Sequence, residues 1–106
     1  MVKIVDVTEL EQKMKDSQSA VKSAAAEIFG EERACFDRGE VPGILIISGR
    51  NRPITEDIVI VKYLRTTPYV EVCSRADFDN AKTLAERCEK IVGSEFELRT
   101  NYSSQH

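Results

Sequence analysis

The segment SGRNRP, residues 48–53, has the residue types and spacing that point most directly to chemistry. It separates two apolar runs, and its glycine, asparagine and proline are typical of a hairpin turn. Those three residues do not account for Arg50 and Arg52. An arginine presents a planar fork of donors that fits phosphate and carboxylate groups, and two arginines in a tight turn can converge on one anion. The segment therefore predicts an anion contact at Arg50, Asn51 and Arg52.

Two further basic residues, Lys62 and Arg65, extend this prediction to the next strand and turn. Residues 43–68 carry four basic and two acidic side chains, whereas the whole chain has a net charge of −3. A focused contact with an acidic partner fits this distribution better than a coat over nucleic acid does. The alternative is that the arginines keep an exposed loop in solution and pair with Glu56 or Asp57.

Catalytic chemistry has little support in the sequence. The single histidine is His106, so neither a His-based triad nor a histidine-rich metal site is expected. The three cysteines lack C-x-x-C spacing, which favours small buried hydrophobic positions for them. Glu71, flanked by valines, and Cys73, near a helix start, are the remaining candidates. We therefore expect a protein that is not an enzyme and that needs no cofactor or metal.

The composition is that of a single domain, residues 1–106. Of the 106 residues, 42% are hydrophobic and 31% are charged, which suits one core and argues against disorder. The apolar runs reach about five residues, whereas a membrane span needs roughly 20. The start of the chain becomes acidic and helical where a signal peptide would become apolar. We expect a cytosolic protein without a membrane segment.

The hydrophobic pattern predicts an α+β fold, a two-layer sandwich of order (β)-α-β-β-β-α-β with a mainly antiparallel sheet. The expected elements are a short strand at 2–7, a long helix to about 29, a helical turn around 34–36, strands at 43–48, 57–65 and 69–74, a second, shorter helix to about 92, and a strand at 95–100. Residues 101–106 are expected to form a frayed tail.

Helix ends are predicted from capping residues. Thr8 and Glu11 have the spacing of a capping box, and the segment 74–77 has the same form with Asp77 in place of glutamate. Gly30 and Gly93 are the predicted C-terminal caps. Met14 and Val21 belong to a heptad-like apolar seam along the first helix. We favour a helix that lies on the sheet over one that pairs with a partner chain.

The strand at 57–65 is apolar on both faces, which raises a packing problem. A two-layer sandwich covers only one face of its sheet, and an exposed apolar face usually contacts a partner. Either the helices lie on opposite faces, or a partner covers one face. We predict a homodimer or partner contact through Val59, Val61 and Tyr63, or through the seam at Met14 and Val21.

Two functions follow as hypotheses. The first is a non-catalytic binding or regulatory module whose basic hairpin contacts an acidic partner, either nucleic-acid phosphate or protein carboxylates. The second is a protein–protein adaptor, inhibitor or complex subunit that uses an apolar sheet face or the helix seam and binds no nucleic acid. Binding through phosphate contacts falls steeply with salt, whereas apolar docking does not.

Overall fold

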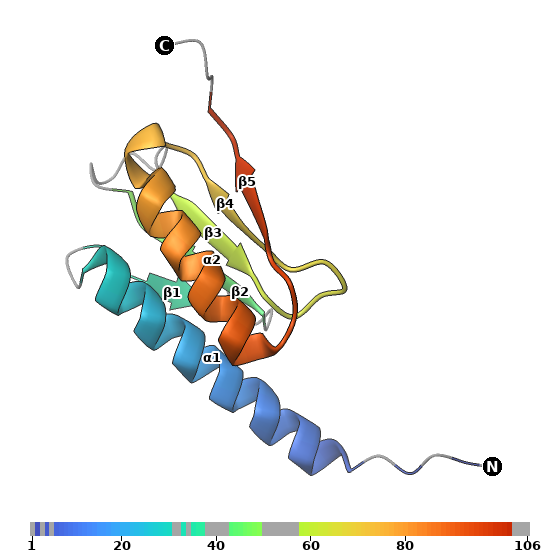
Figure 1. The fold of residues 1–106 in the computed structure, drawn as a ribbon. Coiled ribbons are helices and arrows are strands. Elements are labelled where there is room, and N and C mark those ends of the chain that lie inside the picture. The colour runs from blue at the N-terminus through green and yellow to red at the C-terminus, as the bar shows by residue number, and fades with distance from the viewer. Residues whose placement is uncertain are drawn as a thin grey trace.

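A computed structural model describes residues 2, 4, 6–30, 33, 35–37, 43–49 and 58–102. Over these residues the chain forms two long helices and one mixed sheet of five strands (Figure 1). The predicted α+β class is confirmed. Both helices lie on the same face of the sheet, which gives the two-layer sandwich. None of the described helices is long and apolar enough to cross a bilayer.

The first helix, α1, spans Val7–Phe29. It begins earlier than the capping box predicts, because Asp6 Oδ1 accepts a hydrogen bond from the Thr8 amide at 2.9 Å, as an N-cap carboxylate does. Gly30 follows the helix at φ +87°, as predicted, and its amide donates to Ala26 O at 2.8 Å. The strand expected at 2–7 is not seen at residues 2, 4 and 6, and Ile4 is 94% exposed.

Four of the five strands lie where the apolar runs predict them. Their bounds are Ile44–Ile47 for β2, Val59–Lys62 for β3, Tyr69–Val72 for β4 and Glu97–Thr100 for β5. The fifth, β1, spans Cys35–Asp37, where the sequence predicted a helical turn. That prediction is wrong because these three residues pair antiparallel with β2, and such pairing leaves no local sequence signal.

The spatial order of the strands follows the chain, β1-β2-β3-β4-β5. The first three pairings are antiparallel, and β5 alone runs parallel to its neighbour β4. A parallel neighbour requires a crossover, which the second helix supplies. The backbone hydrogen bonding continues past β5, since the Asn101 amide donates to Val72 O at 2.8 Å. Asn101 thus belongs to the sheet rather than to the predicted tail.

The second helix, α2, spans Phe78–Val92 and follows a short 3-10 turn at Arg75–Asp77. Neither Ser74 nor Asp77 makes a side-chain cap, so the predicted capping motif is wrong. The end of the helix is as predicted. Gly93 has φ +79°, and its amide donates to Glu89 O at 2.8 Å, which closes the last turn.

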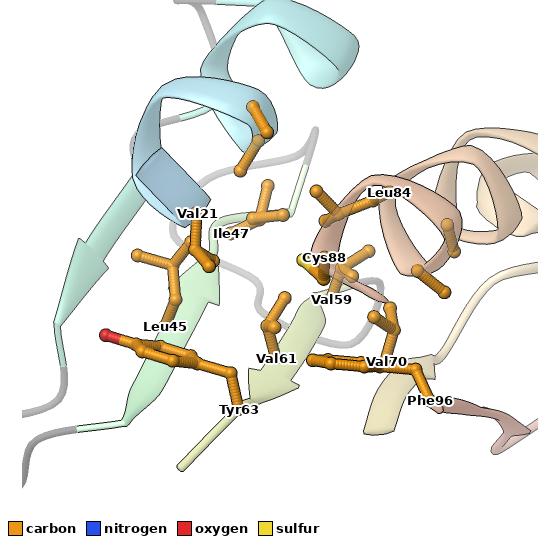
Figure 2. Packing of buried hydrophobic residues seen from close by; sticks show 14 of the residues in the cluster. Val21, Leu45, Ile47, Val59, Val61, Tyr63, Val70, Leu84, Cys88 and Phe96 are labelled. Carbon is orange, nitrogen blue, oxygen red and sulfur yellow. The ribbon is translucent and has the colours of Figure 1, made fainter. Parts of the chain in front are cut away.

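The core lies between the two helices and one face of the sheet (Figure 2). Small residues of α1 and α2 let the helix backbones approach the strands, as Ala24 and Ala81 do. Strand residues that point toward the helices fill the space between the layers. These are Leu45, Ile47, Val59, Val61, Val70 and Val72, each at most 1% exposed.

The turn before β2 depends on a glycine. Gly43 has φ +89°, and a Cβ at this position would lie 2.6 Å from Leu64 Cβ. Its carbonyl accepts a hydrogen bond from the Tyr63 amide at 2.9 Å, which extends the β2–β3 pairing by one position. Only glycine allows both this backbone conformation and this close approach. Gly43 thereby fixes where β3 ends and the turn that carries Arg65 begins.

Candidate functional site

The face of the sheet turned away from the helices is not covered by any described element, and we call it the uncovered face. Strand alternation and the pairing register place its side chains in two rows. One row consists of Ile44, Lys62, Tyr69 and Glu97, and the other contains Ile46, Ile60, Glu71 and Arg99. The β2–β3 side is therefore aliphatic, and the β4–β5 side is charged and aromatic.

Three cations gather around Tyr69 on this face. The ring centroid lies 3.7 Å from Arg99 Cζ, 5.0 Å from Arg65 Cζ and 5.6 Å from Lys62 Nζ, all within the range of cation–π attraction. Tyr69 is only 5% exposed although no helix packs on its face. We call these four residues the Tyr69 cluster. Its cations come from β3, the β3–β4 turn and β5, and β4 supplies the ring.

Few carboxylates neutralise the positive charge of the Tyr69 cluster. Arg99 Nη2 forms an ion pair with Glu97 Oε1 at 3.1 Å along the same strand. Among the described residues, neither Lys62 nor Arg65 is in an ion pair with a carboxylate. Glu71 faces the same side, next to Ile60 and Arg99 in the register. The patch therefore has a small excess of positive charge, confined to the end of the sheet where β3 ends and β4 begins.

The predicted contact residues separate into two groups. Arg50, Asn51 and Arg52 lie outside the described residues, so their contact stays a prediction. Lys62 and Arg65 lie in the Tyr69 cluster. Arg65 follows the end of β3 at Lys62, in the turn that leads to β4.

The partner face predicted from the sequence requires a correction. Val59, Val61 and Tyr63 are at most 1% exposed and face the helices, and Val21 is fully buried against them (Figure 2). Their side chains form the core and are not accessible to a partner. The apolar residues on the other side of the same strands, Ile44, Ile46 and Ile60, are half-buried and lie on the uncovered face.

Met14 is the one predicted seam residue that remains partly exposed, at 37%. It borders a shallow groove of about 390 Å³ between α1, the end of α2 and the β3–β4 turn. The groove is lined by Lys13, Met14, Asp16, Ser17, Leu64, Ile91 and Val92. Neither Glu71 nor Cys73, the candidates for catalysis, belongs to it. The titratable residues of the groove, Lys13 and Asp16, are both exposed on α1.

Sequence reasoning missed a buried ion pair at the other end of the sheet. Arg33 Nη1 and Asp77 Oδ1 are 2.7 Å apart, and the two residues are 8% and 2% exposed. Arg33 Nε also donates to Ser48 O at 2.8 Å, and its guanidinium lies 5.1 Å from the Phe29 ring centroid. The acid at the start of α2 was read as a cap. No local signal links it to an arginine 44 positions earlier.

The described residues hold no group of three or more histidine, cysteine, aspartate or glutamate side chains arranged to bind a metal ion. Of the cysteine side chains that the structure describes, Cys73 is half-buried and Cys88 is buried. Comparisons with protein-family models, with curated proteins and with solved structures found no match to this chain.

Proposed function

We propose that this protein is a non-catalytic binding module that contacts an anionic macromolecule through the Tyr69 cluster. The observation that carries the proposal is the convergence of Lys62, Arg65 and Arg99 on one ring of the uncovered face. The ring supports three cations at fixed positions, and two of these have no ion-paired carboxylate among the described residues. Arginine forks and a lysine ammonium are the donors that phosphate and carboxylate groups need.

The proposal moves the main contact from the hairpin predicted from the sequence to the sheet. The contact predicted at Arg50, Asn51 and Arg52 remains a candidate second contact. A cytosolic location is part of the proposal, and the thiol of Cys88 suits a reducing compartment.

A second candidate function is that of a protein–protein adaptor or subunit. The observation that favours it is the aliphatic side of the uncovered face, where Ile44, Ile46 and Ile60 are half-buried with no described element against them. Aliphatic side chains that become fully buried in an interface contribute about 1.5–3 kcal/mol each before the costs of association. Such a contact would be almost insensitive to salt.

Fluorescence anisotropy with labelled single-stranded DNA, duplex DNA and polyglutamate tests the main proposal. The wild-type chain should bind at least one of these polyanions at low salt. The double variant Lys62→Ala/Arg65→Ala should bind about tenfold or more weakly at the same salt, because two anion contacts are lost. The slope of log K against log salt for single strands should also flatten by about 1.4.

The matched control is Lys82→Ala/Lys90→Ala, which removes two exposed cations from α2 and leaves the sheet intact. It changes the net charge by the same amount, so it should alter binding much less than the cluster variant does. Equal losses in the two double variants would mean that net charge alone drives binding. That result, or no binding of any polyanion at low salt, would contradict the proposal.

A further inference from the structure

Arg99 differs from the other two cations in how it meets Tyr69. Its Cζ lies 3.7 Å from the ring centroid, whereas Lys62 and Arg65 are at 5.6 and 5.0 Å. A distance of 3.7 Å is the spacing of two stacked planes, and arginine stacks on aromatic faces. We infer that the guanidinium lies face to face on the ring. The Tyr69 ring packs against one face of the Arg99 guanidinium, and the guanidinium shields the ring from solvent.

The Arg99 side chain is partly accessible, and because one side of its guanidinium lies on Tyr69, we infer that the opposite face is exposed. The Arg99 side chain keeps 39% of its surface, while Tyr69 below it keeps 5%. The ion pair between Nη2 and Glu97 Oε1 uses one edge of the guanidinium and fixes the rotation of its plane. A carboxylate ligand binds a guanidinium at its edge, and one edge is already taken. The surface therefore presents the flat outer face of the Arg99 guanidinium, which Tyr69 and Glu97 hold in place.

A planar π-system is the chemistry that fits such a face. Single-stranded nucleic acids are recognised by stacking unpaired bases on aromatic rings or on arginine planes, while nearby cations hold the phosphates. In a duplex the base faces are already stacked on each other, and an acidic peptide offers carboxylates rather than planes. Lys62 and Arg65 lie 5.6 and 5.0 Å from the centroid of the same ring, within reach of the backbone of such a strand.

We propose that the uncovered face binds single-stranded nucleic acid, with an unpaired base stacked on the outer face of Arg99 and its flanking phosphates on Lys62 and Arg65. This inference rests on the proposed function and adds the class of ligand to it. Arg99 is paired with Glu97, which leaves Lys62 and Arg65 as the contacts for about two phosphates. The slope of log K against log salt should therefore be about −1.4, because a single strand loses about 0.7 per phosphate.

The test compares a short single-stranded DNA with an abasic strand of equal length, which has the phosphates and sugars but no bases. The wild-type chain should bind the normal strand about fivefold or more tightly than the abasic one, the lower end of what one stacked base contributes. It should also prefer the single strand to a duplex. This comparison needs no variant, so a folding defect cannot confuse it.

The variant Arg99→Lys then assigns the stacking to this residue. Lysine keeps the charge and loses the plane. Affinity for the normal strand should fall about fivefold or more, and affinity for the abasic strand should stay within about twofold. Arg87→Lys, the same change at an ion-paired arginine of α2, is the matched control and should alter neither affinity.

Three outcomes would overturn the inference. Equal binding of normal and abasic strands would exclude base stacking, and a preference for duplex or for polyglutamate would name another ligand class. Equal affinities of the wild type and Arg99→Lys for the normal strand would show that the base does not stack on Arg99. In each of these cases polyanion binding through Lys62 and Arg65 stands. The binding module itself is contradicted by a failure to bind any polyanion, or by equal losses of binding in the two double variants.

Discussion

Cys88 has none of its surface exposed and lies in the core beside Val59 (Figure 2). Burial raises the pKa of its thiol from 9.0 to about 12, because the thiolate would lose its hydration, and the positive charge of Arg87 offsets only part of this effect. At neutral pH the residue therefore behaves as a small hydrophobic side chain. The expectation of buried, inert cysteines fits this residue.

This pKa predicts how stability depends on alkaline pH. Between pH 9 and 12 the unfolded chain loses the Cys88 proton while the folded chain keeps it, so the unfolded state is favoured as the pH rises. The free energy of unfolding should fall by up to about 1.4 kcal/mol per pH unit from this residue, and below pH 9 the residue should contribute no slope. Urea denaturation of the wild type and Cys88→Ala at pH 8 to 10.5 measures it. Parallel pH profiles of the two proteins would contradict the assignment.

Single residues were predicted from the sequence only in part. The positive charge of residues 43–68 is visible along the chain, and it predicts Lys62 and Arg65 as contact residues. Arg99 was missed because its neighbour across the sheet, on β4, depends on β5 returning parallel to that strand. Neighbours that arise from a crossover leave no trace in local spacing. A reader of the sequence sees Tyr69 and Arg99 as unrelated positions.

Arg33 joins three elements that meet at one end of the sheet. It follows α1, and its side chain reaches Ser48 at the end of β2 and Asp77 at the start of α2. Removing the arginine would leave a carboxylate buried without its cation, which costs about 3–5 kcal/mol in folded proteins. Arg33→Met should therefore lower the free energy of unfolding in urea by about that amount.

The double variant Arg33→Met/Asp77→Leu replaces the pair by apolar side chains and should recover most of this loss, because such replacements are often neutral. Arg87→Met breaks the exposed pair with Glu27 and serves as the control, with an expected change of about 1 kcal/mol or less. If Arg33→Met proved as mild as Arg87→Met, the buried pair would not be what holds the three elements together.

The elements were predicted well where their cause is local. Gly30 and Gly93 stop the helices at the positions that the sequence indicates, and the apolar runs mark β2 to β5. The predictions failed where the cause is a partner far along the chain. Cys35–Asp37 becomes a strand through pairing with β2, and Asp77 binds Arg33 in place of an amide of its own helix. Propensity is a weak guide at such positions.

At the scale of the whole molecule, the apolar side of the uncovered face still predicts association of two copies. Five strands at about 4.8 Å spacing and four residues at about 3.3 Å give a face of about 300 Å², whereas stable interfaces bury about 800 Å² per partner. A dimer through this face alone should thus be weak and concentration-dependent. Sedimentation velocity should show it at high micromolar concentration and not at low micromolar concentration.

The variant Ile46→Lys should abolish this dimer, because it places a charge at the centre of the aliphatic patch. Met14→Lys is the control for the other apolar surface, the groove beside α1, and should leave the dimer intact. A wild-type chain that stays monomeric at high micromolar concentration would contradict the homodimer. Loss of the dimer in Met14→Lys alone would move it to the helix seam.

The fold class followed from the alternation of the strands, but the choice of face did not. Residues 57–65 are apolar on both sides, and the sequence pattern assigns neither side to the helices. The sequence predicts a partner contact through Val59, Val61 and Tyr63, but in the structure their side chains form the core. Which face of the sheet a helix covers depends on how the whole chain connects the helix to the strands. The alternation of apolar residues within one strand therefore cannot predict it.

α1 reaches beyond the sheet, and every described side chain between Val7 and Asp16 is exposed. The first six residues of α1, Val7 to Gln12, precede the groove residues and extend about 9 Å as a continuation of a helix that is already nucleated and packed further along (Figure 1). This projecting part of α1 should move as one rigid unit with the rest of the domain. A fluorophore attached near its tip would report the tumbling of the entire domain, and it would stand clear of the sheet face on which a ligand is proposed to bind.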